Sequence, residues 1–242
     1  MPWIGANQGR TQPFSVGRVV ADDEATRAFL QRVYFFMSLG LATTGLIALA
    51  VVSSPAALRF IFGTPLVFFG LMITELLLVV AFGRVAARVS AGTAALMFFA
   101  YAALSGVTFS VIFLRYTMGS IGGAFVVTGG MFAALSAYGA LTKRDLSSLG
   151  SFCFMGLVGL IIASVVNIFL GSSMLYWLTT FAGVLIFTGL TVYDTAKLKA
   201  LGAAGAEGDA QTRLALQAAL VLYLDFVNLF LMLLRLLGRR RN

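Results

Sequence analysis

The stretch that decides the fold is residues 214–237, LALQAALVLYLDFVNLFLMLLRLL. It is apolar and longer than the roughly 20 residues that a helix needs to cross a bilayer. Asp225 nevertheless lies near its middle. An ionised carboxylate at that depth costs about 2.5–3.5 kcal/mol or more, so it normally has a partner, a proton or a water-filled path. The segment therefore predicts a transmembrane helix whose acidic residue has a function.

The composition around this segment is that of a membrane protein. The chain has 242 residues, of which 60% are hydrophobic and 11% charged. Soluble domains carry about 25% charged residues, so this chain has too few to cover its surface in water. We therefore predict an all-α integral membrane protein that crosses the lipid bilayer several times. The formal charge of +8 lies in tails and turns, which is typical of loop charges beside a membrane, and we expect no nucleic acid partner.

Residues that could catalyse a reaction or hold a cofactor are scarce. The chain has no histidine, which excludes metal sites with histidine ligands and catalytic Ser/His or Cys/His pairs. Cys153 is the single cysteine and lies in an apolar segment, where a thiol usually serves packing. We therefore expect no enzymatic activity and no cofactor.

Seven apolar windows of about twenty residues follow one another along the chain. They fall at 33–53, 64–83, 91–114, 120–141, 149–170, 175–196 and 214–237. They predict a seven-helix transmembrane domain over 32–238, between a polar N-terminal tail over 1–31 and a basic C-terminal tail over 239–242.

Glycines recur inside two of these windows. They are Gly122, Gly123, Gly129 and Gly130 in the fourth, and Gly156 and Gly159 in the fifth. Helices in lipid associate through close backbone approach at small residues. We interpret these glycines as packing positions, with a hinge as the alternative.

The distribution of lysine and arginine predicts the orientation. Eleven lie in the N-terminal tail and in the connections on its side of the membrane, against two in the opposite connections. Basic residues near membrane spans stay in the cytoplasm. We therefore expect the N-terminus to be cytoplasmic.

The C-terminal tail conflicts with this pattern. Seven full spans would place it outside, yet it carries Arg239, Arg240 and Arg241. Either the last segment is re-entrant and returns the tail to the cytoplasm, or it spans fully and carries the tail across. Its length of about 24 residues, or roughly 36 Å of helix, favours a full span.

Three acidic residues lie within or at the edge of the apolar segments: Glu75, Asp194 and Asp225. In a straight hairpin, at about 1.5 Å per residue, the two aspartates would be offset by around 10 Å. Helix tilt, or an earlier start of the last helix, would close this gap. If the two carboxyls meet in a low dielectric they cannot both ionise cheaply, so they would share a proton near neutral pH and repel when it leaves.

The same two carboxylates would also offer hard oxygen ligands to Ca²⁺. The alternative is that each aspartate bonds to a neighbouring helix for structure alone.

Three further residues are candidates for supporting this pair. Asn228 lies three residues beyond Asp225 on the same helix face, and we expect it to donate to that carboxyl. Thr191 lies one turn before Asp194 on its face. Arg84 is a candidate partner of Asp194 by depth, or a lipid headgroup anchor. Since Glu75 and Arg84 are nine residues apart, they point to opposite sides of a straight helix.

Several phrases of this sequence resemble one known family. They are LYLDFVNLFL at 222–231, LLRLLG at 233–238, VYDT at 192–195, and ITEL at 73–76, which contains Glu75. From the first helix to its end, the chain is similar to the Bax inhibitor 1 family, the transmembrane Bax inhibitor motif proteins, and to its bacterial members in particular.

The resemblance implies a seven-helix bundle whose last helix is central and wrapped by the other six. It implies that Asp194 and Asp225 form a pH-responsive pair gating a Ca²⁺ leak, with a nearby arginine for which Arg84 is the nearest candidate. It also implies a place in the bacterial inner (plasma) membrane. Bacterial relatives are linked to the membrane AAA protease FtsH, for which the N-terminal tail would be the handle.

Three functions therefore remain open. The first is a Ca²⁺ leak channel gated by the aspartate pair. The second is a modulator or substrate of an FtsH-type protease without a pore. The third, more remote, is an intramembrane aspartyl protease. That active site has a Gly-x-Gly run before its second aspartate, whereas Leu222-Tyr223-Leu224 precedes Asp225 here.

Overall fold

The structure is a computed structural model that describes residues 16–241, with side chains described from Glu24 onward. This part of the chain forms eight helices and no β-strand, apart from one isolated bridge between Tyr116 and Arg240. The helices are α1 (Val16–Val52), α2 (Pro55–Gly63), α3 (Pro65–Val85), α4 (Ala91–Arg115), α5 (Met118–Leu141), α6 (Ser147–Leu170), α7 (Ser173–Gly202) and α8 (Gly208–Leu237).

All of the helices except α2 are long and apolar enough to cross a membrane. The seven predicted spans and the all-α fold class are therefore confirmed. The short helix α2 was not predicted, because its nine residues lie in what the sequence suggests is a loop. The two prolines of this region begin helices, Pro55 in α2 and Pro65 in α3, since proline tolerates the first helical turn where its missing N–H is not needed.

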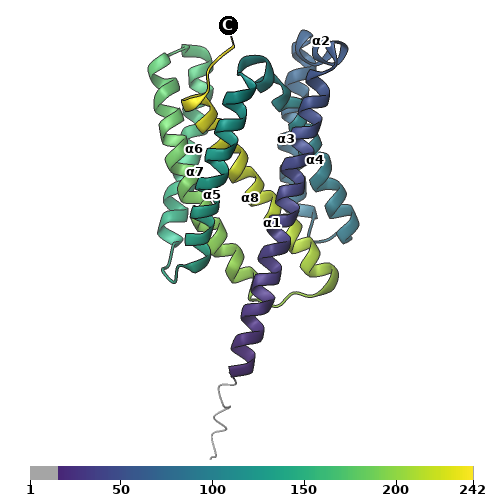
Figure 1. The fold of residues 1–242 in the computed structure, drawn as a ribbon, viewed down its shortest axis with the longest axis vertical. Helices are drawn as coiled ribbons and strands as arrows, with labels where there is room; N and C mark the ends of the chain where they lie inside the picture. Colours follow the sequence, from purple (N-terminus) through teal and green to yellow (C-terminus); the bar gives the residue numbers. More distant parts are fainter. Residues whose placement is uncertain (1–15, 242) are drawn as a thin grey trace, which may run out of the picture.

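Helix α8 is the centre of the bundle, as Figure 1 shows, where it runs diagonally between the other helices. More than half of its most apolar window is buried (56%), against 6% for α3 and 11% for α6. It packs directly on α1, α4, α5 and α7, whereas α3 packs on α4 and α6 packs on α7. The predicted central position of the last helix is thus confirmed, with α3 and α6 as an outer layer.

A buried polar contact ties three of these helices together. The hydroxyl of Thr44 in α1 lies 2.7 Å from the hydroxyl of Tyr223 in α8 and donates to the carbonyl of Ala102 in α4 at 2.8 Å. All three residues are buried. Because a buried hydroxyl without a partner is costly, this arrangement fixes the register of α8 against α1 and α4.

Helix α1 begins earlier than the sequence suggested. It starts at Val16, inside the stretch predicted to be a polar tail, and its N-terminal part projects beyond the bundle (Figure 1). Phe29 and Val33 are buried in the main core, so the transmembrane domain recruits residues ahead of position 32. The predicted tail before Val16 lies outside the described residues.

The last segment is not re-entrant. Helix α8 is continuous over 30 residues, and its end at Leu237 lies at the opposite end of the bundle from the start of α1 (Figure 1). The residues after α8 bind the end of α4 and the α4–α5 connection: the backbone N–H of Arg241 donates to the carbonyl of Arg115 at 2.8 Å, and that of Thr117 donates to the carbonyl of Arg239 at 3.3 Å. The full span expected from the segment's length is therefore what the structure contains.

The glycines expected to pack between helices do not all do so. A Cβ at Gly122, Gly123, Gly129, Gly130 or Gly159 would meet no atom within 4 Å, and only Gly156 of that set approaches a neighbour, Ile186. The close approaches occur at other glycines. A Cβ at Gly139 would lie 2.5 Å from the carbonyl oxygen of Val192, and one at Gly106 would lie 2.6 Å from that of Thr44. For most of the named glycines the packing interpretation was wrong, because those positions face away from the bundle.

Candidate ion and proton site

A cleft of about 990 Å³ lies between α3 and α6 and reaches α8. Its walls come from α3, α4, α6, α7 and α8, and most of its lining is apolar. Glu75, Asp194 and Asp225 all line it. This α3–α6 cleft exists because neither outer helix packs closely on the central one, and it brings the three acidic residues predicted from the sequence into one space.

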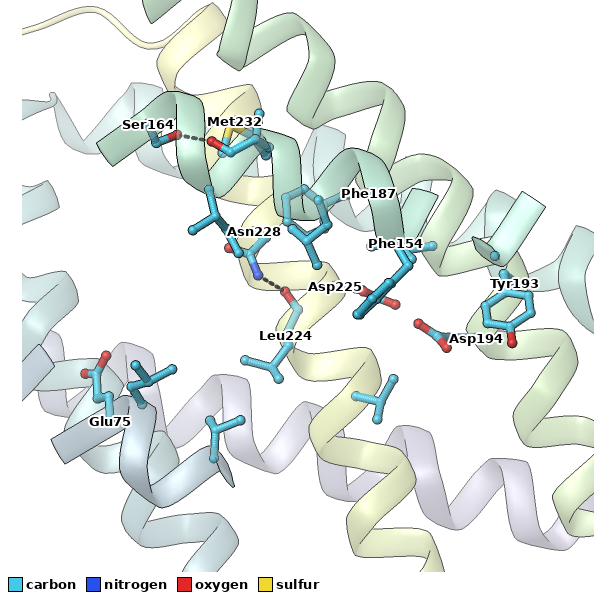
Figure 2. A pocket seen from close by; sticks show the side chains of 18 of the residues that line it. Glu75, Phe154, Ser164, Phe187, Tyr193, Asp194, Leu224, Asp225, Asn228 and Met232 are labelled. Carbon is cyan, nitrogen blue, oxygen red and sulfur yellow. Dashed lines mark hydrogen bonds between the residues drawn. The ribbon is translucent and has the colours of Figure 1, made fainter. Parts of the chain in front are cut away.

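The two aspartates meet inside this cleft. Figure 2 shows the carboxyl groups of Asp194 and Asp225 facing one another from α7 and α8. Asp225 is only 5% exposed. Its Oδ2 atom has no hydrogen-bond donor among the described residues. Because two carboxylates are both acceptors, the contact is favourable only when one of them carries a proton.

Helix tilt closes the offset that a straight hairpin would leave. Helix α7 continues past the end of its apolar window to Gly202, and α8 begins about equally far ahead of its own window, at Gly208. Because the two extensions are equal, the earlier start of α8 does not by itself reduce the offset between Asp194 and Asp225. Helix α8 runs diagonally across the bundle (Figure 1), and the carboxyls of Asp225 and Asp194 face one another (Figure 2).

A lysine and a tyrosine that the sequence analysis did not select as site residues lie near Asp194 in the cleft. Lys197 and Tyr193 both line it. Lys197 is the cation whose charge acts on Asp194, and its Nζ lies 5.9 Å from the centre of the Tyr193 ring. The sequence already indicated that Lys197 lies near Asp194, because it follows that residue by three positions and so lies on the same helix face.

Glu75 lines the same cleft but belongs to a different contact. It accepts a hydrogen bond from the hydroxyl of Thr108 in α4. Figure 2 shows it on the α3 side, well apart from the aspartate pair. Glu75 therefore adds negative charge and an acceptor to the cleft without joining the pair.

The other three predicted supporting residues, Asn228, Thr191 and Arg84, form no hydrogen bond or ion pair with the aspartates among the described residues. The amide of Asn228 lines the cleft but donates to the carbonyl of Leu224 on its own helix at 2.8 Å (Figure 2), so the expected bond to Asp225 is absent. The hydroxyl of Thr191 donates to the carbonyl of Phe187 at 2.8 Å. In both cases the polar group is satisfied by the carbonyl one turn earlier in its own helix. Arg84 is exposed and does not line the cleft.

The donor set suits a proton or a passing cation better than a tightly held metal. Among the described residues no group of three or more His, Cys, Asp or Glu side chains could hold a metal ion. Ca²⁺ takes about six to eight oxygen ligands, so the two carboxylates would leave most of them to water or to backbone carbonyls. The arrangement can hold one proton between α7 and α8, and it can attract a cation when that proton has left.

Comparison with known proteins places the whole bundle in one group. Residues 26–242 match the family described as inhibitor of apoptosis-promoting Bax1. The chain is 43% identical to the inner membrane protein YbhL of Escherichia coli K12, over 92% of this chain and 96% of that protein.

It is 42% identical to an uncharacterised protein of Borreliella burgdorferi, over 88% of this chain and 93% of the relative. It is 35% identical to an uncharacterised membrane protein of Streptococcus pyogenes, over 90% and 95% of the two chains. With a family match over nearly the entire chain and a central last helix that carries Asp225, the protein belongs to the Bax inhibitor 1 family of membrane proteins.

Proposed function

We propose that this protein is a pH-sensitive Ca²⁺ leak channel whose gate is the pair Asp194 and Asp225. The observation that supports it most is the position of the two carboxyls, which face one another in the cleft (Figure 2) while the buried Oδ2 of Asp225 has no hydrogen-bond partner among the described residues. A proton shared by the pair would let one carboxyl donate a hydrogen bond to the other and so join α7 to α8. The Ca²⁺ ion is the transported species in this proposal rather than a resident cofactor.

The gate works through the shared proton. With the proton present, the pair carries one negative charge, partly balanced by Lys197. When the proton leaves, two like charges in contact repel each other strongly because the surrounding dielectric is low. The repulsion separates α7 from α8 at this level and exposes two hard oxygen ligands to a cation. Flux is therefore expected to rise with pH over the range in which the proton is lost.

The cleft supports a path for the ion on one side of the gate. Glu75 on α3 and the aspartate pair on α7 and α8 line the same space of about 990 Å³. Acidic residues inside a membrane protein normally mark such paths. A cation entering this cleft would meet Glu75 and the pair in one continuous volume.

We further propose that the protein lies in the inner membrane with its N-terminus in the cytoplasm. The relative from E. coli is described as an inner membrane protein. The excess of lysine and arginine on the N-terminal side of the bundle supports the orientation.

The direct test of the leak is Ca²⁺ entry into sealed proteoliposomes that contain the purified full-length protein and an internal Ca²⁺ indicator. Entry should exceed that of protein-free liposomes and should be faster at pH 8 than at pH 6. Entry equal to that of protein-free liposomes at both pH values would rule the proposal out.

A second candidate is a modulator or substrate of a membrane AAA protease of the FtsH type, which needs no pore. The projection of the N-terminal part of α1 beyond the bundle favours it (Figure 1), because a protease needs a segment outside the membrane to engage. Deleting residues 2–15, ahead of α1, should lengthen the protein's lifetime in cells and leave Ca²⁺ flux unchanged. An unchanged lifetime would contradict this role without affecting the leak proposal.

A further inference from the structure

The end of the bundle opposite the start of α1 carries positive charge without negative charge. Its connections are residues 53–64, 116–117 and 171–172, together with 238–241 after α8. Within the described residues these stretches contain no Asp or Glu. The arginines at this end, in these stretches or in the last turn of α4 or α8, are Arg59, Arg115, Arg235, Arg239, Arg240 and Arg241. No carboxylate in these stretches is therefore available to pair with the arginines.

Two of these arginines line a cavity of about 580 Å³. The cavity lies among the end of α6, the start of α7 and the end of α8, and we call it the arginine cavity. The guanidinium groups of Arg235 and Arg240 lie 5.7 and 6.0 Å from the centre of the same aromatic ring, that of Tyr176. Two like charges on one ring repel each other, and an anion placed between them would remove that repulsion.

Neighbouring residues hold Arg240 in position. Arg240 contacts the hydroxyls of Tyr176 and Tyr116, and these contacts raise the pKa of Arg240 further above its ordinary value, so its charge is permanent. The backbone is fixed as well, because Arg240 forms a bridge with Tyr116 and the N–H of Arg239 donates to the hydroxyl of Ser120 at 2.9 Å. A charged group that is held before binding loses little entropy when a ligand arrives.

We propose that the arginine cavity binds a phosphate group, supplied by the headgroup of an anionic phospholipid in the leaflet opposite the N-terminus. The planar fork of arginine pairs with phosphate oxygens through charge-assisted hydrogen bonds. The surroundings are those of a membrane interface, where tyrosine and tryptophan gather: Tyr176 and the exposed Trp177 line the cavity. Ser172 and Ser173, at the start of α7, also line the cavity with hydroxyl groups.

This inference is independent of the Ca²⁺ leak, because the arginine cavity lies at the far end of α8 from the connection to α7 and shares only α6, α7 and α8 with the α3–α6 cleft. A soluble phosphate ion has the same chemistry as the headgroup. The experiment must therefore separate the two sources.

Trp177 provides a local probe. The chain has two tryptophans, Trp3 and Trp177, so the variant Trp3→Phe leaves fluorescence from the cavity alone. The full-length variant in detergent is titrated separately with short-chain phosphatidylglycerol, with short-chain phosphatidylcholine and with inorganic phosphate. The same titrations are made with Arg235→Gln/Arg240→Gln added, and with Arg59→Gln as the control, since Arg59 is an exposed arginine at the same end that does not line the cavity.

Phosphatidylglycerol should give a saturable change in emission, with binding weakened at least about tenfold in the double variant because charge-assisted hydrogen bonds are lost. The Arg59→Gln control should bind as the parent does. Saturation by inorganic phosphate alone, lost in the double variant, would support the phosphate site but overturn the lipid as its source. Equal binding of phosphatidylcholine, or unchanged affinity in the double variant, would overturn the proposal.

If the double variant does not fold, the Trp3→Phe protein with both arginines intact tests the proposal by itself. Added NaCl should then weaken phosphatidylglycerol binding progressively, because salt screens exposed charges. Binding that is insensitive to salt would contradict a site built on arginine.

Discussion

At the scale of single residues, two aspartates of this chain have opposite surroundings. Asp225 is buried, and its Oδ2 has no donor among the described residues. Asp145 lies in the α5–α6 connection, where its Oδ1 accepts from the hydroxyl of Ser147 at 2.6 Å and from the backbone N–H of Ser147 at 2.9 Å. These hydrogen bonds hold the pKa of Asp145 below its ordinary value of 3.8. Asp145 therefore stays ionised at every pH near neutrality.

The first prediction uses Asp145 as the matched control for the gate. A carboxyl with a lowered folded-state pKa gives stability that is present above its ordinary pKa and lost as pH falls through the lowered value. For Asp145 that window lies below pH 3.8. Asp145→Asn should therefore leave the change in Ca²⁺ flux between pH 6 and pH 8 unaltered, as measured in proteoliposomes. A reduced pH response in this variant would show that titration outside the aspartate pair contributes.

The sequence predicted the residues of the site better than their contacts. Asp194, Asp225 and Glu75 could be selected because a carboxyl inside an apolar segment is costly, and all three line one cleft. The bond from Asn228 to Asp225 could not be excluded from spacing, because an amide on that face can equally donate to the carbonyl four residues earlier, here that of Leu224. Whether the two aspartates meet depended on the tilt of α8, which no local pattern encodes.

At the scale of helices, packing in this bundle depends on glycines other than those that stand out in the sequence. A run of glycines in α5 faces away from neighbours, while Gly139 of the same helix lies against the backbone of α7. Spacing alone does not tell these apart, because small residues serve close approach only on the face that meets another helix.

The second prediction compares two glycines of α5. In Gly139→Ala the new methyl would lie 2.5 Å from the carbonyl oxygen of Val192 and 3.1 Å from the Cβ of Thr195, and overpacking of this kind costs about 1–3 kcal/mol. In Gly129→Ala the methyl meets nothing within 4 Å, and alanine favours a helix over glycine by up to about 1 kcal/mol. Denaturant unfolding in detergent should rank Gly139→Ala below the wild type and Gly129→Ala at or above it. The reverse order would contradict the packing of α5 on α7.

The sequence predicted the ends of helices that stop where an apolar window stops. It did not predict the ends of helices that continue into polar sequence. The seven windows found the spans because each is apolar for about twenty residues. Helix α1 extends back to Val16, and the signal for part of this extension was the i, i+4, i+8 spacing of Phe29, Val33 and Met37, which are all buried. The tertiary contacts of Phe29 and Val33, rather than hydropathy, hold that part of α1.

At the scale of the whole molecule, the basic residues divide between the two ends. Charge counting alone suggested that Arg239, Arg240 and Arg241 return to the cytoplasm. The structure instead binds these residues to the α4–α5 connection at the end opposite the start of α1. Helix α8 is continuous over 30 residues and is long and apolar enough to cross a membrane despite the charge that follows it.

The third prediction tests this topology with single cysteines. Cys153→Ala first removes the native thiol, which is buried. A cysteine at Gly205, in the α7–α8 connection, and one at position 242 should then react with a membrane-impermeant thiol reagent from opposite sides of the membrane. With the N-terminus in the cytoplasm, position 242 should label in intact cells and position 205 only after lysis. Labelling of both positions under the same condition would contradict the full span of α8.

The central claim is that Asp194 and Asp225 act as one proton-binding unit. Its most direct test is the pH dependence of Ca²⁺ flux in proteoliposomes that contain the wild type, Asp194→Asn, Asp225→Asn or the double variant. Asparagine keeps the shape of aspartate but cannot lose a proton, so each single change should abolish the difference between pH 6 and pH 8. The double variant should be no more impaired than either single one, as expected for residues that act together. Single variants that keep the wild-type pH response, or effects that simply add in the double variant, would contradict the claim.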